Sequence, residues 1–397
     1  MRVVQINSVA TGSTGSIAKK LSSAMTREGI ENRIFYGIGN SDFADAQKFG
    51  DMGSLRMHQL ATRLLDRHGT ASATPTKKMI EALKAFRPDI VHLHNIHGFY
   101  LHIPLLFSYL KENHIPVLWT MHDCWAFTGH CAHFQQIACE KYKTGCRECP
   151  GLSAYPRSWY IDRSQKNYEE KKAWFQGFES LHIAAPSVWL KDRLSESFFK
   201  DYPVHVVHNG IALHTFSDKP IKKPDWASGK RIYLGISAQW IPEKGFHDFL
   251  SMANMLCEDE LLVLVGDGPT DVPKNIIRFP RTGTAEELID YYHMADVFVN
   301  PTHCDTFPTV NMEAWACGTP VVTYDVGGSA EIPDDTCGAS VSVGDTNGLL
   351  QHARRLAVLP DIRTRCITRA ACFSEEQQLS AYMQLYHTIG GLKQWIY

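Results

Sequence analysis

The chain has 397 residues, of which 44% are hydrophobic and 21% charged, a composition that excludes a disordered or fibrous protein and is typical of a soluble globular one. The length exceeds one ordinary core and predicts two domains. The net charge is only −2, but residues 1–210 carry 25 Lys and Arg against 19 Asp and Glu, whereas residues 211–397 carry 15 against 23. The basic first half favours an anionic membrane surface over nucleic acid as a partner, and uneven charge without any partner is the alternative.

The first residues, 1–7, are predicted to form a strand and not a signal peptide. No apolar window approaches the length of a membrane-spanning helix. We therefore expect a cytoplasmic protein, at most peripheral to the inner face of the cytoplasmic membrane. In that reducing compartment, its 11 cysteines are expected to be thiols or metal ligands.

Short β-branched runs alternate with helical patterns along most of the chain. The predicted strands of the first half are residues 3–7, 33–36, 90–94, 117–121, 181–185 and 204–207. Those of the second half are residues 232–237, 261–266, 276–279, 297–300, 320–324 and 339–343. Strands separated by helices predict parallel sheets with both faces covered. The expected fold class is therefore α/β, with two doubly wound, Rossmann-like domains.

The domain boundary is expected near residues 209–211, because a polar, proline-containing stretch at 219–229 precedes the next strand. We predict an N-terminal domain over residues 1–210 and a C-terminal domain over 211–375. An amphipathic helix within 376–397 is expected to pack on one of the two domains.

Loops that follow strands are the candidate binding elements, because ligands of doubly wound sheets lie beyond the C-terminal ends of the strands. Gly12 and Gly15 occupy the first such loop, before a helix whose start favours anions; a plain tight turn is the alternative. His122 and Asp123 follow the fourth predicted strand, where a histidine can meet a ligand hydroxyl or transfer a proton. A structural histidine is the alternative reading.

The loops and helix starts that follow strands in the second half also carry candidate binding residues. Lys244 follows the first strand of the second domain and can reach a diphosphate, although a solvated surface lysine would look the same. Gly266 and Gly268 permit close approach to a base or ribose, or simply form a turn. Asp305 and Glu313 lie at the entrance and in the first turns of one predicted helix, where carboxylates can accept from sugar hydroxyls while helix N–H groups attract phosphate.

Four cysteines lie within 19 residues of a loop-rich insert at 124–150: Cys131, Cys139, Cys146 and Cys149. The last two form a Cys-x-x-Cys pair that suits tetrahedral zinc. A structural zinc ion could hold together a segment too polar to fold around its own core. Reduced, partly buried thiols are the alternative.

Taken in order, these elements resemble the retaining GT-B glycosyltransferases of family 4, in particular the bacterial members that build exopolysaccharides, capsules and O-antigens. The resemblance covers nearly the whole chain. It rests on the glycine loop at 12–15, the His-Asp pair at 122–123, the sequence His-Asn-Gly-Ile at 208–211, Pro-Glu-Lys-Gly at 242–245 and Gly-Asp-Gly-Pro at 266–269. It also rests on the block that contains Asp305 and Glu313, and its most specific part runs from Glu313 to Val322.

The resemblance implies two domains facing a central cleft, with the C-terminal helix crossing back to the first domain. It implies that Glu313 holds the ribose of a UDP- or GDP-sugar, that Asp305 holds the transferred sugar and that Lys244 neutralises the departing diphosphate. The backbone around Phe307, Pro308, Thr309 and Val310 would assist, although Pro308 has no N–H to donate. His122 would lie beside the donor sugar, and Gly15 would let the first loop approach phosphates or acceptor. No catalytic metal or organic cofactor is expected.

Two positions depart from the family pattern. Asp305 stands where the family usually has Glu, and Gln239 stands where it often has an arginine that assists Lys244. Arg281 or Arg278 is a candidate to compensate for Gln239. The expected activity is transfer of a hexose or deoxyhexose, with retention of configuration, to a lipid-linked oligosaccharide. An epimerase, a phosphorylase and a catalytically silent binding protein are the alternatives.

Overall fold

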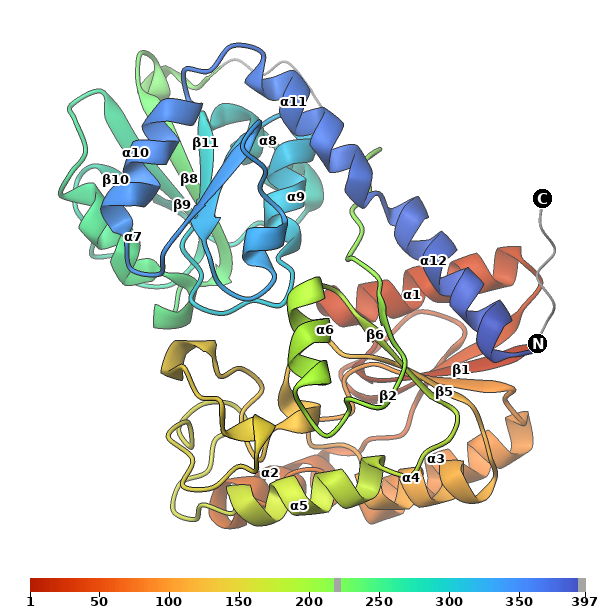
Figure 1. Cartoon of the computed structure of the whole chain (residues 1–397). Coiled ribbons are helices and arrows are strands. Elements are labelled where there is room, and N and C mark those ends of the chain that lie inside the picture. The colour runs from red at the N-terminus through yellow and green to blue at the C-terminus, as the bar shows by residue number, and fades with distance from the viewer. Residues whose placement is uncertain (218–222, 392–397) are drawn as a thin grey trace. The chain divides into compact units, whose positions relative to one another are not determined.

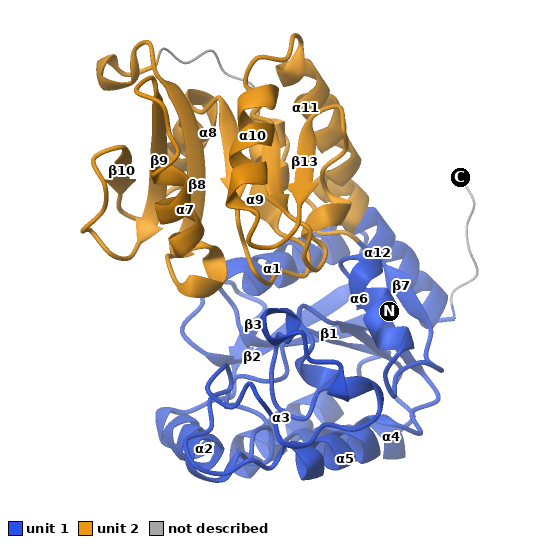
Figure 2. Ribbon diagram, turned by 60° about the vertical axis from the view of Figure 1, so that its left-hand side comes forward, with its two compact units in different colours: residues 1–207, 379–397 blue, residues 208–378 orange. Residues whose placement is uncertain are grey.

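The computed structural model describes residues 1–217 and 223–391 (Figure 1). The chain divides into unit 1, formed by Met1–Val207 with the described residues from Leu379 onward, and unit 2, formed by His208–Gln378 (Figure 2). The division lies three residues before the predicted boundary at residue 210. Part of the predicted linker, 218–222, and the end of the predicted last helix, 392–397, lie outside the described residues.

Unit 1 contains a parallel seven-stranded sheet with strand order β3-β2-β1-β4-β5-β6-β7. Its strands are β1 (Arg2–Val9), β2 (Glu31–Ile38), β3 (Ala46–Lys48), β4 (Ile90–Leu93), β5 (Val117–Thr120), β6 (Leu181–Ala185) and β7 (Val204–Val206). The apolar runs of β4 and β5 are buried along their whole length, as expected for central strands covered on both faces. β3 was not predicted, because this three-residue edge strand contains only Ala, Gln and Lys.

The helices of unit 1 connect these strands. They are α1 (Gly12–Arg27), α2 (Met52–Leu65), α3 (Ala73–Phe86), α4 (Ile103–Glu112), α5 (Ser164–Phe175) and α6 (Val188–Ser195). The predicted cysteine-rich insert follows β5 and contains only short 3-10 turns. The ends of β1, β4 and β5 therefore bring the glycine loop, a histidine-rich segment and the His-Asp pair to the same edge of the sheet.

Unit 2 contains a parallel six-stranded sheet with strand order β10-β9-β8-β11-β12-β13. Its strands are β8 (Arg231–Gln239), β9 (Glu260–Asp267), β10 (Ile276–Phe279), β11 (Val297–Asn300), β12 (Val321–Tyr324) and β13 (Gly338–Val341). Its helices are α7 (Phe246–Ala253), α8 (Ala285–Met294), α9 (Thr309–Ala316), α10 (Thr346–Leu356) and α11 (Ile362–Ala370). Two parallel sheets of this kind confirm the predicted α/β class with two Rossmann-like domains.

The last described helix, α12 (Glu375–Ile389), begins in unit 2 and continues in unit 1. At its start, Ile211 and Ser374 form an isolated parallel bridge. From Leu379 onward, its apolar side packs in a buried cluster with the sheet residues Val3, Ile90 and Leu118. No helix in the described parts of the chain is long and apolar enough to cross a membrane.

Candidate functional site

The glycine loop of unit 1 packs tightly against the start of α1. A Cβ atom on Gly15 would lie 2.5 Å from the carbonyl carbon of Ala10, so only glycine lets the helix approach the end of β1 this closely. Gly12 has a φ of +75° with open space around it, which suits a turn. Thr11 makes no side-chain cap, so the first N–H groups of α1 keep their capacity to bind an anion.

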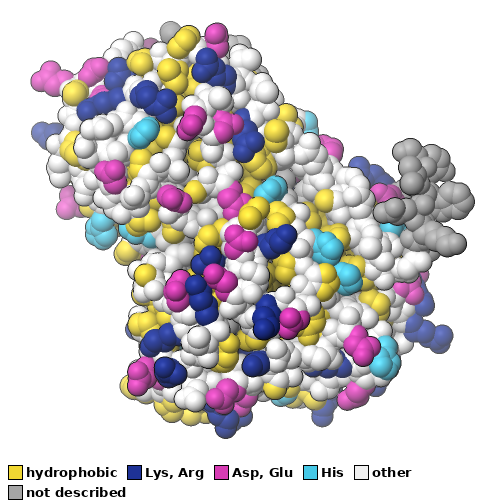
Figure 3. Space-filling view, in the orientation of Figure 1, with side chains coloured by type: hydrophobic (Ala, Val, Ile, Leu, Met, Phe, Trp, Pro, Cys, Tyr) yellow, Lys and Arg dark blue, Asp and Glu magenta, His cyan; other side chains and the backbone are white. Residues whose placement is uncertain are grey.

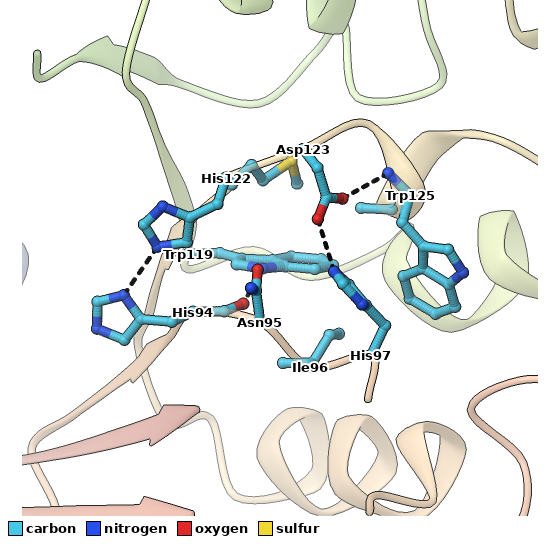
Figure 4. Close-up of a pocket in the computed structure, with 10 residues that line it drawn as sticks. His94, Asn95, Ile96, His97, Trp119, His122, Asp123 and Trp125 are labelled. Atoms are coloured by element: carbon cyan, nitrogen blue, oxygen red, sulfur yellow. Dashed lines mark hydrogen bonds and ion pairs between the residues drawn. The ribbon is translucent and has the colours of Figure 1, made fainter. Parts of the chain in front are cut away.

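The His-Asp pair lies directly after β5, where it was predicted. Asp123 accepts from Nε2 of His97 at 2.6 Å and from the backbone N–H of Trp125 at 2.8 Å (Figure 4). Although burial alone raises it, the pKa of Asp123 is lowered because His97 lies beside it and donates to it. Removal from solvent lowers the pKa of His122 to about 4, so its imidazole is neutral at physiological pH.

A second histidine supports His122. Nδ1 of His94 lies 3.2 Å from Nε2 of His122, and Nε2 of His94 lies 3.0 Å from the side-chain oxygen of Gln5. The rings of His94 and His122 are stacked with an interplanar angle of 16°. Burial lowers the pKa of His94 well below its usual value, so this ring is also neutral. Gln5 and His94 thus fix the orientation of His122 from the core of the sheet.

His94, His97, His122 and Asp123 line a pocket within unit 1 (Figure 4). Its walls are His94, Asn95, Ile96, His97, Trp119, Met121, His122, Asp123, Trp125 and Ala126. Aromatic faces, apolar side chains and a few polar groups of fixed orientation are what a sugar site requires, because each sugar ring has apolar C–H faces and polar hydroxyls.

A buried lysine contacts the segment that contains Trp125, one of the residues lining this pocket. Nζ of Lys171, on α5, donates to the carbonyl oxygens of Trp125 at 2.7 Å and Thr128 at 2.9 Å. The same ammonium lies 3.5 Å from the centre of the Trp125 ring, in cation–π geometry. Burial lowers the pKa of Lys171 to about 7. Lys171 therefore fixes the segment that carries His122 and Asp123 without itself lining the pocket.

In unit 2, Lys244 and Asp305 form an ion pair, with Nζ 3.0 Å from Oδ2. Although burial lowers it, the pKa of Lys244 is raised overall because the Asp305 carboxylate lies beside it. The turn that carries Lys244 is held against the loop after β11, where the N–H of His303 donates to the carbonyl of Glu243 at 2.9 Å. Gly245 makes this approach possible: its φ is +74°, and a Cβ there would lie 2.2 Å from the carbonyl oxygen of Pro301.

Glu313 lies on α9 and is held from the neighbouring helix α8. The Tyr292 hydroxyl donates to Oε2 of Glu313 at 3.0 Å. Burial raises the pKa of Tyr292, and the neighbouring Glu313 carboxylate raises it further, so the phenol stays a donor. The carboxylate of Glu313 is therefore held at a defined position one to two turns from the start of α9.

The start of α9 combines a buried anchor with partly exposed backbone. The Phe307 ring is buried and stacks on His208 with ring centres 4.7 Å apart, and its carbonyl accepts from the side-chain amide of Asn209 at 3.1 Å. Phe307 therefore serves the core, and only its backbone is suited to contact a ligand. Thr309 and Val310 are half-buried, and helix geometry leaves their N–H groups without intrahelical acceptors.

The remaining predicted positions surround the ends of β8 and β9. A Cβ on Gly266 would lie 1.7 Å from the carbonyl oxygen of Ser237, so this glycine is required by the close approach of two strands. Arg278 donates to the carbonyls of Gly266 at 2.6 Å and Pro269 at 2.8 Å, which holds the loop of Gly268. Gln239 and Arg281 are exposed. Arg278 thus has a structural task, and its help for Lys244 stays a prediction.

The four cysteines of the insert are only partly brought together. Cys131 and Cys149 interact directly through their thiols, and Cys146 lies near both. Cys139 is half-buried beside Cys146. Among the described residues, no three His, Cys, Asp or Glu side chains are grouped as a metal ion would require. The zinc site stays a prediction.

Four side chains that line or support the candidate site were not identified from the sequence: Gln5, His94, His97 and Tyr292. A signal for two of them exists, because His92, His94 and His97 follow one another at the end of a predicted strand. That spacing places histidines at the same sheet edge as His122. Gln5 and Tyr292 carry no such signal, because a lone buried glutamine and a helical tyrosine look like ordinary core residues.

Two family models match the chain. Residues 15–215 match the model of Glycosyltransferase Family 4, which covers more than half of the chain, and residues 231–358 match the model of Glycosyl transferases group 1. The first ends just after the boundary between the units, and the second contains Lys244, Asp305 and Glu313.

Individual proteins agree with this result. The Escherichia coli (strain K12) protein assigned as colanic acid biosynthesis glycosyl transferase WcaC is 23% identical over 98% of this chain and 100% of its own. Sucrose-phosphate synthase from Thermosynechococcus elongatus superposes with a TM-score of 0.69 at 17% identity, covering 98% of this chain and 99% of that one. Anabaena HepE, solved with UDP-glucose, has a TM-score of 0.65 at 13% identity over 99% and 100% of the two chains. The fold is therefore of the GT-B type, and the chain belongs to glycosyltransferase family 4.

Proposed function

We propose that this glycosyltransferase moves a hexosyl or deoxyhexosyl group from a UDP- or GDP-sugar to a lipid-linked oligosaccharide, with retention of configuration, during synthesis of a bacterial surface polysaccharide. Similarity to a colanic acid glycosyl transferase supports the polysaccharide. The likeness to HepE, whose structure contains UDP-glucose, supports a nucleotide-sugar donor. The basic first half of the chain supports work at the inner face of an anionic membrane.

The observation that carries the proposal is the ion pair of Lys244 with Asp305 beside the start of α9. An ammonium whose pKa is raised stays charged at neutral pH and can stabilise the negative charge that develops on a departing diphosphate. The Asp305 carboxylate accepts hydrogen bonds from sugar hydroxyls. Lys244 would therefore stabilise the departing diphosphate and Asp305 would hold the sugar, which are the two groups joined by the bond that breaks.

The other residues divide between donor binding and positioning. Glu313, oriented by Tyr292, would accept from the ribose hydroxyls. The N–H groups of Thr309 and Val310 would donate to phosphate oxygens. His122, neutral and oriented by His94, would meet a hydroxyl of a bound sugar.

The proposed reaction uses no protein nucleophile. The acceptor hydroxyl oxygen forms a bond to the anomeric carbon on the face from which the phosphate departs. The bond between that carbon and the phosphate oxygen breaks, its electron pair stays on the diphosphate, and the acceptor proton passes to a phosphate oxygen. Positioning and charge stabilisation would then supply most of the rate enhancement.

Thermal-shift measurements with UDP-, GDP- and ADP-sugars test the donor, because a ligand that binds only the folded state raises its apparent stability. The preferred donor should then be consumed only with a lipid-linked acceptor, and Glu313→Ala should abolish transfer. Consumption of donor without acceptor would indicate an epimerase, and a requirement for inorganic phosphate would indicate a phosphorylase. Binding without turnover across acceptors would indicate a silent binding protein.

A further inference from the structure

Helix α2 presents four of its large apolar side chains outward, whereas Leu55 and Leu64 are half-buried. Its inward face carries the buried polar residues His58 and Thr62, whereas Met52, Met57, Leu60 and Leu65 are exposed. Met57 has 65% of its surface exposed. The buried positions of this helix are thus polar, whereas an ordinary surface helix buries its apolar residues against the core.

A loop next to α2 extends this surface. Trp159, Tyr160 and Ile161 are all exposed, Tyr160 by 80%. The N–H of Trp159 donates to the carbonyl of Arg63 on α2 at 2.8 Å, and the Arg63 guanidinium lies 5.6 Å from the centre of the Trp159 ring. Helix and loop therefore form one continuous surface, which we name the apolar-basic face.

This concentration is not random scatter. Fourteen large hydrophobic side chains are exposed in the described parts of the chain, and eight of them lie within residues 52–65 or 155–161. Single exposed apolar residues need no explanation, but a contiguous group of this kind marks an interaction surface. Figure 3 shows hydrophobic side chains interspersed with Lys and Arg and with Asp and Glu in the lower part of the view.

The charges of the apolar-basic face are mainly positive. α2 contains Arg56 and Arg63 and no acidic residue, and the exposed Arg67 and Arg157 flank it. Of the neighbouring carboxylates, Asp66 is buried against His130 at 2.7 Å. The exposed Asp51 and Asp162 accept from backbone N–H groups at a helix start and in a loop. The apolar-basic face therefore carries four arginines and two exposed carboxylates, and both carboxylates already accept hydrogen bonds from backbone N–H groups.

We propose that the apolar-basic face docks on an anionic lipid bilayer. Arginine, tryptophan and tyrosine beside aliphatic side chains are the composition that suits the boundary between headgroups and acyl chains. A second copy of this chain fits less well, because an isologous contact would bring arginines against arginines. The location of the acceptor at that bilayer rests on the proposed function, whereas the docking itself does not.

The pocket of unit 1 is linked to this face. Tyr155, itself exposed, lies with its hydroxyl 3.0 Å from Nδ1 of His97, whose other ring nitrogen contacts Asp123. A bilayer seated on the apolar-basic face would therefore lie next to the pocket that carries His122. A lipid-linked acceptor could then reach this pocket without its lipid leaving the membrane.

Vesicle flotation of the full chain tests the proposal without any sugar donor. The protein should float with an equal mixture of phosphatidylcholine and phosphatidylglycerol, and far less with phosphatidylcholine alone. Met57→Ser/Leu60→Ser should lower the partition coefficient about tenfold. Arg56→Gln/Arg63→Gln should lower it roughly fivefold per arginine and weaken its salt dependence.

Matched controls lie on exposed positions of unit 2. Val343→Ser/Val358→Ser also replaces two exposed apolar side chains by serine, and Arg355→Gln/Arg365→Gln makes the same change as the arginine variant; both should leave flotation unchanged. Equal flotation of all four variants, or no flotation of the unmodified chain, would overturn the proposal. A dimer in sedimentation velocity that Met57→Ser/Leu60→Ser dissociates would assign the face to a second copy instead. If the unmodified chain floated as expected but transferred no sugar, only the proposed function would be contradicted.

Discussion

The side-chain oxygen of Gln5 lies 3.0 Å from Nε2 of His94, and this contact determines which nitrogen of His122 carries a hydrogen. The Gln5 amide nitrogen donates to the Ala18 carbonyl at 2.8 Å, so its oxygen faces His94 as an acceptor. The neutral His94 therefore carries its hydrogen on Nε2, and its Nδ1 accepts from Nε2 of His122. His122 is thus held in the tautomer whose Nδ1 bears a lone pair.

Replacing Gln5 by Met should allow His122 to populate both neutral tautomers. Gln5→Met keeps the size of the side chain but removes the acceptor for Nε2 of His94, so either nitrogen of His94 can carry the hydrogen. The ¹⁵N chemical shifts of His122 should move from a single tautomer toward a mixture. If His122 accepts from a sugar hydroxyl, kcat should fall about tenfold.

A purely structural role for Gln5 predicts a different result. The Gln5→Met variant would then lose stability while the ¹⁵N shifts of His122 stayed those of one tautomer. That outcome would refute the positioning of His122 by Gln5.

Acid should destabilise unit 1 through its buried histidines. Burial lowers the pKa of His58 and His122 to about 4 and that of His92 to about 3. Below the ordinary histidine pKa of 6.5, the unfolded chain therefore binds protons that the folded chain does not. The stabilisation is present above about pH 6.5 and is lost as pH falls toward 4, by about 1.4 kcal/mol per pH unit for each proton.

Urea unfolding at several pH values between 7 and 5 measures this slope. In His92→Gln, the slope of the unfolding free energy should decrease by about one proton. The variant also loses contacts to Tyr386 and Thr120, so its stability at pH 7 is expected to fall as well. An unchanged slope in His92→Gln would contradict the assignment.

Much of the fold could be predicted because its signals are local. Each of the twelve predicted strands contains or overlaps a strand of the structure, since buried parallel strands are continuous apolar runs between turns. Val343 shows the limit of this signal: β13 ends at Val341, and Val343 is exposed. Hydrophobicity alone does not indicate where a strand leaves its sheet.

Site residues could be predicted only where a charged or polar side chain lies after a predicted strand. Lys244 and Asp305 lie in loops that follow strands, and Glu313 lies on the helix after such a loop, so these positions could be identified. The structure brings Lys244 and Asp305 into contact. Tyr292 could not be identified, because its link to Glu313 joins two helices 21 residues apart in sequence. The outward apolar side of α2 was equally hidden, since its pattern is helical whichever side faces the core.

Gly245→Ala tests how the turn of Lys244 is held. A Cβ there must avoid the Pro301 carbonyl, so the turn should move and take Lys244 away from Asp305. We expect a loss of roughly 1–3 kcal/mol in the free energy of unfolding. The affinity for nucleoside diphosphate, measured by calorimetry, should fall together with it.

Gly229 provides the matched control. Its φ of +71° is close to that of Gly245, but a Cβ there would meet nothing within 4 Å. Gly229→Ala should therefore cost only about 1 kcal/mol and leave nucleotide affinity unchanged. Equal effects of the two substitutions on affinity would show that backbone strain, and not the position of Lys244, is responsible.

Tyr292→Phe tests whether the orientation of Glu313 matters for binding. The variant removes one hydroxyl from a buried ring and leaves the carboxylate of Glu313 without that donor. Stability should fall by about 1 kcal/mol, the usual value of one buried hydrogen bond. If Glu313 holds the ribose, the affinity for UDP or GDP should also fall roughly fivefold, because the carboxylate must be reoriented on binding.

Tyr233 in the same unit allows the two effects to be separated. It is equally buried, and its hydroxyl donates to Oε1 of Glu260 at 2.8 Å. Tyr233→Phe should lower stability by a similar amount and leave nucleotide affinity unchanged, because Glu260 is occupied by Arg231 and Arg354. If calorimetry gave the same affinity for Tyr292→Phe as for Tyr233→Phe, the bond from Tyr292 would serve folding alone, and Glu313 would not depend on it to bind ribose.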